Sequence, residues 1–116
     1  MLIAAMLELM RQLGLDIIVL TEEINEAEFF ASRLTRIETM RLLKSLTKTA
    51  ANLPAETRER MIEIDWAAWA ALANVLPNPG KHPLQIWIAI KELTPMTVQK
   101  LNDYKKTQPA LFSIVR

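Results

Sequence analysis

Apolar residues recur every three or four positions over the first 24 residues of the chain. The positions in this stripe are Leu2, Met6, Leu9, Leu13, Ile17, Leu20 and Ile24. Because an α-helix turns once every 3.6 residues, this spacing predicts a long first helix with one apolar face. Gly14 interrupts the run, and glycine costs a helix about 1 kcal/mol relative to alanine. It marks the candidate position for a bend or a break.

Residues 25–32 form an acidic and aromatic connector, anchored by Phe29 and Phe30. Thr35 and Glu38 then have the spacing of a capping box, in which each side chain satisfies a free backbone N–H at a helix start. We therefore predict a second helix that opens there. Its expected buried residues are Leu42, Leu43, Leu46, Ala50 and Leu53.

The middle of the chain predicts two further helices followed by a loop. Pro54 is a suitable first-turn residue for a short, charged helix over residues 55–63. Asp65 can cap the next helix, over residues 66–76, whose apolar side carries tryptophans. Residues 77–83 contain three prolines, which cannot lie inside a helix, so they form a loop.

The last third of the chain is again helical in pattern. The pattern over residues 84–93 predicts a fifth helix. After a kink or a new helix start at Thr94-Pro95, the helical pattern continues over residues 96–106. The tail, residues 108–116, is apolar, so we expect it to pack onto another surface. The sequence therefore predicts an all-α bundle of about five or six helices, in one domain over residues 1–116.

Composition narrows the class of protein. Apolar residues make up 51% of the chain and charged residues 23%, which is typical of a globular protein. The net charge of +1 leaves no overall field that would recruit nucleic acid or membranes. Glu8, Arg11 and Asp16 interrupt the apolar N-terminus, which makes it a poor membrane span. No basic leader precedes the apolar run and no plausible cleavage site follows it, so it is also a poor signal peptide, and we expect a cytoplasmic protein. A chain of this size cannot bury so many apolar residues within one copy, so we also expect a second copy or a partner to cover the remaining apolar surface.

Several features occur in a recognisable order between residues 26 and 101. They are Phe29 in the connector, Leu53-Pro54, the charged segment AETRERMIE, Ile64-Asp65-Trp66, and Ile86-Trp87 with Pro95 eight residues later. This order resembles the HepT-like proteins of the HEPN superfamily. The resemblance implies a helical bundle that forms a homodimer. It also implies a ribonuclease toxin restrained by a minimal nucleotidyltransferase in a toxin–antitoxin module.

The catalytic signature of that family is Arg, four to six residues, His, one residue, Tyr, at the end of the fourth helix. In this sequence it falls on LANVLPNPG, residues 72–80. Ala73 stands at the arginine position, Asn78 at the histidine position and Gly80 at the tyrosine position, while Asn74 matches ordinary members. The resemblance therefore comes with a degenerate motif.

These replacements change the chemistry that the site can perform. An asparagine at position 78 cannot exchange a proton near neutral pH, whereas an acid–base histidine typically contributes about 10²–10⁴ in rate. Ala73 offers no guanidinium to a phosphoryl group, and Gly80 has no hydroxyl for the nucleotidyltransferase to modify. We expect a non-catalytic binding partner of a minimal nucleotidyltransferase.

Two alternatives stay open. In the first, the chain is a divergent ribonuclease toxin that uses His82 as a general base and Lys81 in place of the arginine; a solvated loop histidine is the simpler interpretation. In the second, it binds RNA without turnover. The basic residues for that function, or for docking of an acidic partner, share one arc of the second helix: Arg33, Arg36, Arg41, Lys44 and Lys48.

The sequence gives no indication of a metal or a cofactor. Acidic residues do gather near the first connector, at Glu22, Glu23, Glu26 and Glu28. No histidine or cysteine stands near them, so a solvated patch is the simpler interpretation. We expect no metal site and no cofactor.

Overall fold

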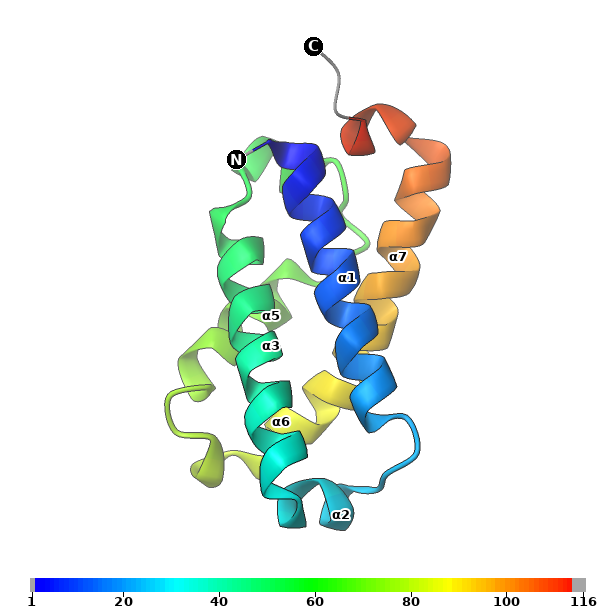
Figure 1. Cartoon of the computed structure of the whole chain (residues 1–116). Coiled ribbons are helices and arrows are strands. Elements are labelled where there is room, and N and C mark those ends of the chain that lie inside the picture. The colour runs from blue at the N-terminus through cyan, green and yellow to red at the C-terminus, as the bar shows by residue number, and fades with distance from the viewer. Residues whose placement is uncertain (1, 114–116) are drawn as a thin grey trace.

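Three long helices run along the length of the molecule. The computed structural model describes residues 2–113, and its principal extents are 46 × 26 × 23 Å. α1 (Ile3–Thr21) packs against α3 (Arg33–Asn52) on one side and α7 (Thr94–Thr107) on the other (Figure 1). No strand occurs among residues 2–113, so the predicted all-α bundle of about five or six helices is confirmed.

Shorter elements close the remaining faces and ends of the bundle. α5 (Trp66–Val75) packs against α3, and α6 (Pro83–Ile88) packs against α5. α2 (Glu26–Ala31) covers one end of α3, while the 3₁₀-helix η3 (Pro109–Phe112) packs on α1 and α7 at the other end (Figure 1). α4 (Ala55–Glu59) connects α3 to α5 through a turn. Within the described residues, no helix is long and apolar enough to cross a membrane.

The buried face of α1 is displaced from the predicted stripe. Met6, Leu13 and Ile17 are buried as predicted, but Leu2, Leu9 and Leu20 are 58%, 38% and 37% exposed. The buried positions also include Ala4, Leu7, Met10, Gly14 and Thr21. Together with Ile17, these residues form a second series with the same three-and-four spacing. Because α1 is covered on two sides by α3 and α7, its buried face is centred between the two series.

Gly14 neither bends nor breaks α1, which is continuous from Ile3 to Thr21. The glycine faces α7, and a β-carbon built on it would overlap Val98 Cγ2. Its backbone φ is not positive, so the position requires a small side chain and not an unusual conformation. Gly14 therefore allows α1 and α7 to approach each other closely.

The predicted capping box at Thr35 and Glu38 is wrong. α3 begins earlier, at Arg33, where the Ser32 hydroxyl accepts a hydrogen bond from Thr35 N at 3.4 Å. The capping box lies instead at the start of α2: Glu28 N donates to Asn25 Oδ1 at 2.8 Å, and Asn25 N donates to Glu28 Oε1 at 2.9 Å. Since Asn25 and Glu28 have the same spacing, the pattern alone did not separate the two candidates.

The other helix boundaries follow their polar and proline residues. Asp65 caps α5 as predicted, since its Oδ1 accepts from Ala68 N at 3.0 Å. α4 is shorter than the predicted helix over residues 55–63 and ends at Glu59. At Thr94-Pro95 the chain passes from the π-helical turn η2 (Ala89–Leu93) directly into α7. The wider turn accommodates the proline, which has no N–H to donate.

The core lies between α1, α3, α5 and α7. Among its fully buried large side chains are Trp69, Phe29, Leu43, Met61 and Leu101. Leu111 and Phe112 of η3 are half-buried against this core, so the predicted docking of the apolar tail is confirmed up to residue 113. Residues 114–116 of that tail lie outside the described part of the chain.

Candidate binding cavity and its cationic rim

The positions that the resemblance assigns to the catalytic signature lie at the C-terminal end of α5 and in the turn after it. Ala73 and Asn74 are exposed on the last turns of α5. Asn78 is also exposed and precedes the short 3₁₀-helix η1 (Pro79–Lys81), which contains Gly80. The backbone fixes this turn, because Asn78 N donates to Val75 O at 3.0 Å and Lys81 N donates to Asn78 O at 3.1 Å.

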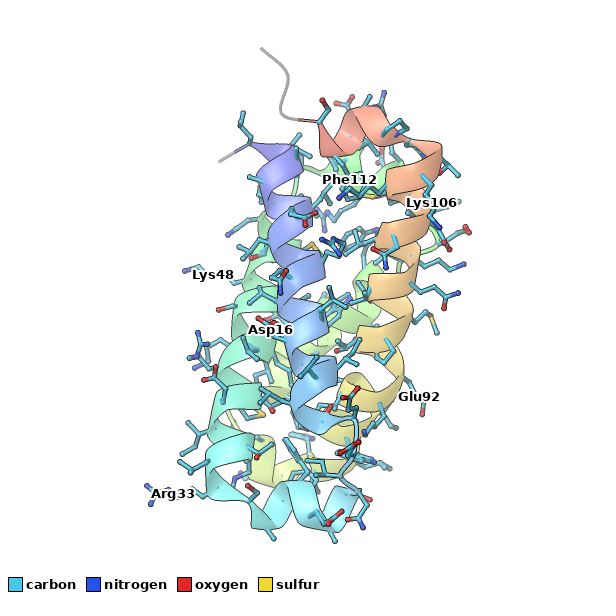
Figure 2. All side chains as sticks on the ribbon, turned by 45° about the vertical axis from the view of Figure 1, so that its right-hand side comes forward. Asp16, Arg33, Lys48, Glu92, Lys106 and Phe112 are labelled. Atoms are coloured by element: carbon cyan, nitrogen blue, oxygen red, sulfur yellow. The ribbon has the colours of Figure 1, made fainter. Side chains whose placement is uncertain are left out.

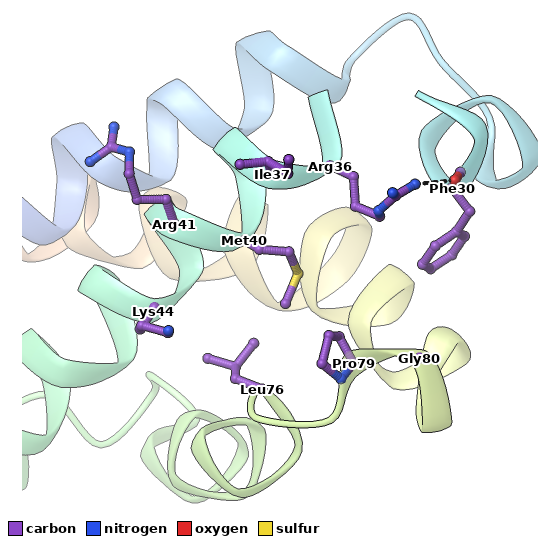
Figure 3. Close-up of a pocket in the computed structure, with 9 residues that line it drawn as sticks. All are labelled: Phe30, Arg36, Ile37, Met40, Arg41, Lys44, Leu76, Pro79 and Gly80. Carbon is purple, nitrogen blue, oxygen red and sulfur yellow. Dashed lines mark hydrogen bonds between the residues drawn. The ribbon is translucent and has the colours of Figure 1, made fainter. Parts of the chain in front are cut away.

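A cavity of about 610 Å³ lies between α3 and this turn. Figure 3 shows its walls, which come from elements far apart in the sequence: α2, α3, the end of α5 and η1. The apolar lining consists of Phe30, Ile37, Met40, Leu76 and Pro79, with Gly80 beside them. The other lining residues are Arg36, Arg41 and Lys44, so no carboxylate borders the cavity.

The three cations around the cavity have different partners. Arg36 Nη1 donates to the backbone carbonyl of Phe30, which joins α3 to α2. Arg41 forms a two-bond pair with Glu38, with Nε–Oε1 at 2.9 Å and Nη2–Oε2 at 2.6 Å. These hydrogen bonds lower the pKa of the Glu38 carboxyl and raise the pKa of the Arg41 guanidinium. Lys44 has no side-chain hydrogen bond or ion pair within residues 2–113.

A second, smaller cavity of about 340 Å³ adjoins the first along α3. Lys44 and Leu76 line both cavities, and Lys48 and Ala73 line the smaller one. Four of the five predicted basic residues therefore lie beside the motif-equivalent positions. Arg33 does not: it is exposed at the first turn of α3 and projects from the end of the bundle (Figure 2).

Lys81 and His82 do not form a braced catalytic pair. Lys81 is exposed, and His82 is half-buried at the start of α6. Only the backbone of His82 is held, since its N–H donates to Pro79 O at 3.1 Å and its carbonyl accepts from Ile86 N at 3.1 Å. Neither side chain has a hydrogen-bond partner within the described residues, and neither lines the two cavities above. The structure supplies no group that would orient the imidazole.

Of the four acidic residues near the first connector, only Glu28 has a structural role among the described residues, as part of a helix cap. Glu22, Glu23, Glu26 and Glu28 are all exposed, and Glu28 belongs to the capping box of α2. Between residues 2 and 113 there is no cluster of three His, Cys, Asp or Glu side chains that could hold a metal ion.

The apolar wall of the cavity is the part of the site that sequence reasoning missed. The basic arc on α3 was visible from its spacing, but Leu76 and Pro79 come from a separate element whose position only the fold determines. One signal was available. Leu34 and Ile37 lie within the basic arc and are 83% and 54% exposed, which is unusual for apolar residues on a solvated charged face.

Comparison of the chain with protein-family models, curated proteins and solved structures gave no match. The chemistry of the site therefore has to be read from its own residues. Cations and apolar side chains can attract and hold an anionic or acidic partner. The residues around the cavity include no imidazole and no carboxylate, which are the groups that most often transfer protons near neutral pH.

Proposed function

We propose that this chain is a cytoplasmic, non-catalytic binding protein: a HepT-like member of the HEPN superfamily with a degenerate ribonuclease motif. Its proposed partner is a minimal nucleotidyltransferase, in a toxin–antitoxin-type module. One observation carries the proposal. Ala73 and Gly80, two of the three positions that the resemblance assigns to the motif, line a cation-rimmed apolar surface, and Asn78, the third, lies in the turn between them.

The surface around these positions supports binding over catalysis. Turnover of RNA would need a proton-exchanging group at a fixed distance from the 2′-hydroxyl, and Asn78 cannot fill that role. Binding needs only complementary shape and charge. Exposed Ile37 provides apolar contact, while Lys44 and Lys48 provide positive charge, a combination that suits an acidic partner with an apolar centre.

The direct test is to look for a minimal nucleotidyltransferase encoded next to this chain and to measure complex formation between the two proteins. We expect a stable complex between the two purified proteins, and we expect Lys48→Glu to weaken it at least about tenfold, because one positive charge of the docking face becomes negative. Lys106→Glu is the matched control, since Lys106 is an exposed lysine on α7, away from this face. Absence of a complex, or equal effects of the two variants, would refute the proposal.

Homodimer formation is part of the same proposal, and α5 is its proposed contact. This helix, WAAWAALANV, has no charged residue and buries only Trp69 and Leu72. Its exposed alanines include Ala67, Ala70 and Ala71, and Ile88 on α6 beside them is 42% exposed. In sedimentation equilibrium we expect a dimer for the parent chain and a monomer for Ala71→Glu, with Ala27→Glu on α2 as the control that stays dimeric.

RNA binding without cleavage is the second candidate function. The observation that favours it is that Arg33, Lys44 and Lys48 are exposed and have no ion pair within residues 2–113. Such lysines release counterions when they meet phosphates, so the affinity for RNA should fall as salt is raised. Replacing both Lys44 and Lys48 by Gln should lower the salt dependence by about one unit of slope per lysine. An affinity for RNA that does not change with salt concentration would exclude this candidate function.

A further inference from the structure

We infer that the 610 Å³ cavity between α3 and η1 is a binding site for a small anionic amphiphile, a medium-chain carboxylate. In this assignment the carboxylate lies at Lys44, and the apolar chain lies against Met40 and Leu76. The inference goes beyond the proposed function, because it concerns a small ligand, which would occupy a cavity that shares Ile37 and Lys44 with the proposed docking face.

The size and the walls of the cavity are those of a ligand site. Pockets for small molecules commonly measure about 300–1,000 Å³ and are lined mostly by apolar side chains with a few polar groups. Here Leu76 is 6% exposed and belongs to the hydrophobic core, and Phe30 and Met40 pack against that core. The apolar wall is therefore supported from behind and does not need the ligand in order to form.

The charges place the anionic group at one end of the cavity. Arg36 already donates to the Phe30 carbonyl, and Arg41 is paired with Glu38. Lys44 is the lining cation without a partner in residues 2–113, and Figure 3 shows its amine on the side of Leu76 and Met40, whereas the Arg41 guanidinium points away. A carboxylate at Lys44 would gain a charge-assisted hydrogen bond without breaking an existing pair.

The lining also selects against nucleotides and sugars. The lining side chains are apolar or cationic, and none carries an oxygen or a neutral ring nitrogen. A base or a sugar would bring several N–H or O–H donors for which no lining side chain is an acceptor, and unpaired buried donors reduce affinity.

The distance between two lining cations sets the length of the ligand. Lys44 and Arg36 are eight residues apart on α3, which is about 12 Å along the helix axis, so an apolar chain of about ten carbons spans the distance between them.

Sodium decanoate, below its micelle-forming concentration, is the probe for this site. It is titrated into the chain labelled with ¹³C at the methionine methyl groups and followed by NMR. We expect saturable shifts of the Met40 methyl and unchanged shifts of Met96, which is 49% exposed on α7 and reports non-specific adsorption. Decyltrimethylammonium and 1-decanol, which share the apolar chain but lack the negative charge, are expected to bind at least about tenfold more weakly.

Two variants locate the ligand within the cavity. No atom lies within 4 Å of a β-carbon built on Gly80, which lines the cavity, and the φ of Gly80 is not positive, so the backbone there accepts the β-carbon of Gly80→Leu. We expect it to preserve the circular dichroism spectrum and to weaken decanoate binding more than tenfold. Lys44→Gln should weaken binding about tenfold through loss of the charged contact. Lys106→Gln, on α7, should leave it unchanged.

Several results would overturn the inference. They are the absence of a saturable Met40 shift, parallel shifts of Met40 and Met96, equal binding of decyltrimethylammonium, and unchanged affinity in Gly80→Leu or Lys44→Gln. If decanoate fails while an added nucleotidyltransferase shifts Met40, the cavity belongs to the protein interface, and this inference fails while the proposed function stands. If decanoate binds and no protein complex forms, the proposed function fails and the ligand site stands.

Discussion

Gly14 of α1 lies so close to Val98 of α7 that a single methyl group on Gly14 would overlap Val98 Cγ2. The contact joins two of the three long helices at a point where both are buried. Val98 is β-branched and has little freedom to rotate away within a helix. The closeness of α1 and α7 therefore depends on the missing side chain at position 14.

Gly14→Ala is expected to destabilise the fold, although alanine is the better helix former. The gain in helix propensity is about 1 kcal/mol, whereas overpacking of a tight contact costs about 1–3 kcal/mol, so a net loss of up to about 2 kcal/mol should result. Urea denaturation measures the free energy of unfolding. In a Val98→Ala background the overlap is removed, and there Gly14→Ala should stabilise the protein. A stabilising effect of Gly14→Ala in the parent chain would contradict this account.

A buried hydrogen bond between α5 and α7 gives a second prediction. Trp69 Nε1 donates to Thr97 Oγ1 at 3.0 Å, and the Thr97 hydroxyl donates to Leu93 O at 2.7 Å. Thr97→Val keeps the shape of the side chain but leaves the buried indole N–H unpaired. We expect a loss of about 1–3 kcal/mol in the free energy of unfolding, measured by urea denaturation.

Thr39→Val is the matched control for that change. The Thr39 side chain is fully buried, and its hydroxyl has no hydrogen-bond partner within residues 2–113. Replacing this hydroxyl by a methyl group removes an unpaired polar atom from the core, so the variant should be neutral or more stable than the parent chain. Equal losses in Thr39→Val and Thr97→Val would show that the hydrogen bond to Trp69 is not the cause.

The positions of the helices could be predicted from the sequence because they depend on local patterns. Spacing of apolar residues indicated α1, and the cap at Asp65 indicated α5. The prolines after α5 indicated the end of that helix, but the predicted loop over residues 77–83 is partly wrong, because Pro79 begins η1 and Pro83 begins α6. The buried face of α1 could not be predicted in the same way. Two series of apolar residues share the same spacing there, and only the packing of α3 and α7 on either side decides between them.

In the candidate site, too, only the residues that share one helix could be predicted from the sequence. Lys44 and Lys48 were predicted to share a face because one helix carries both, and local geometry fixes their relation. Met40 and Leu76 meet across the cavity only because α3 and α5 pack against each other, a long-range contact that no spacing rule reports. Lys81 and His82 line neither cavity, since adjacency along the chain does not bring two side chains into one cleft.

The ion pairs of Glu8 predict a dependence of stability on pH. A hydrogen bond from Arg11 and the charges of Arg11 and of Lys105, which lies 3.7 Å away, lower the pKa of the Glu8 carboxyl. A lowered pKa in the folded state contributes stability above the pKa of the unfolded chain, and this contribution is lost as the pH falls through the folded pKa. Stability should therefore decrease on acidification below about pH 4, where unfolded glutamates take up protons.

Glu8→Gln tests this dependence. The variant should be slightly less stable than the parent chain at pH 7, by well under 1 kcal/mol because the Glu8 side chain is 45% exposed and solvent screens the pair. The difference should disappear in acid, as followed by urea midpoints from pH 7 down to about pH 3. Glu22→Gln is the control, because Glu22 has no ion pair within the described residues. A gap between parent and Glu8→Gln that stays constant with pH would rule out this origin.

The last prediction is that the chain does not cleave RNA, and it depends on His82, the candidate general base. Its imidazole has no hydrogen-bond partner among residues 2–113, and under the proposed function Asn78 stands where the family has its histidine. A general base needs an orienting partner, so we expect no cleavage of single-stranded RNA above the buffer rate, in the presence of EDTA, for the parent chain or for His82→Ala. Both proteins should have the same helical circular dichroism spectrum. EDTA-resistant cleavage by the parent chain that His82→Ala abolishes would establish the ribonuclease alternative and replace the binding function proposed above.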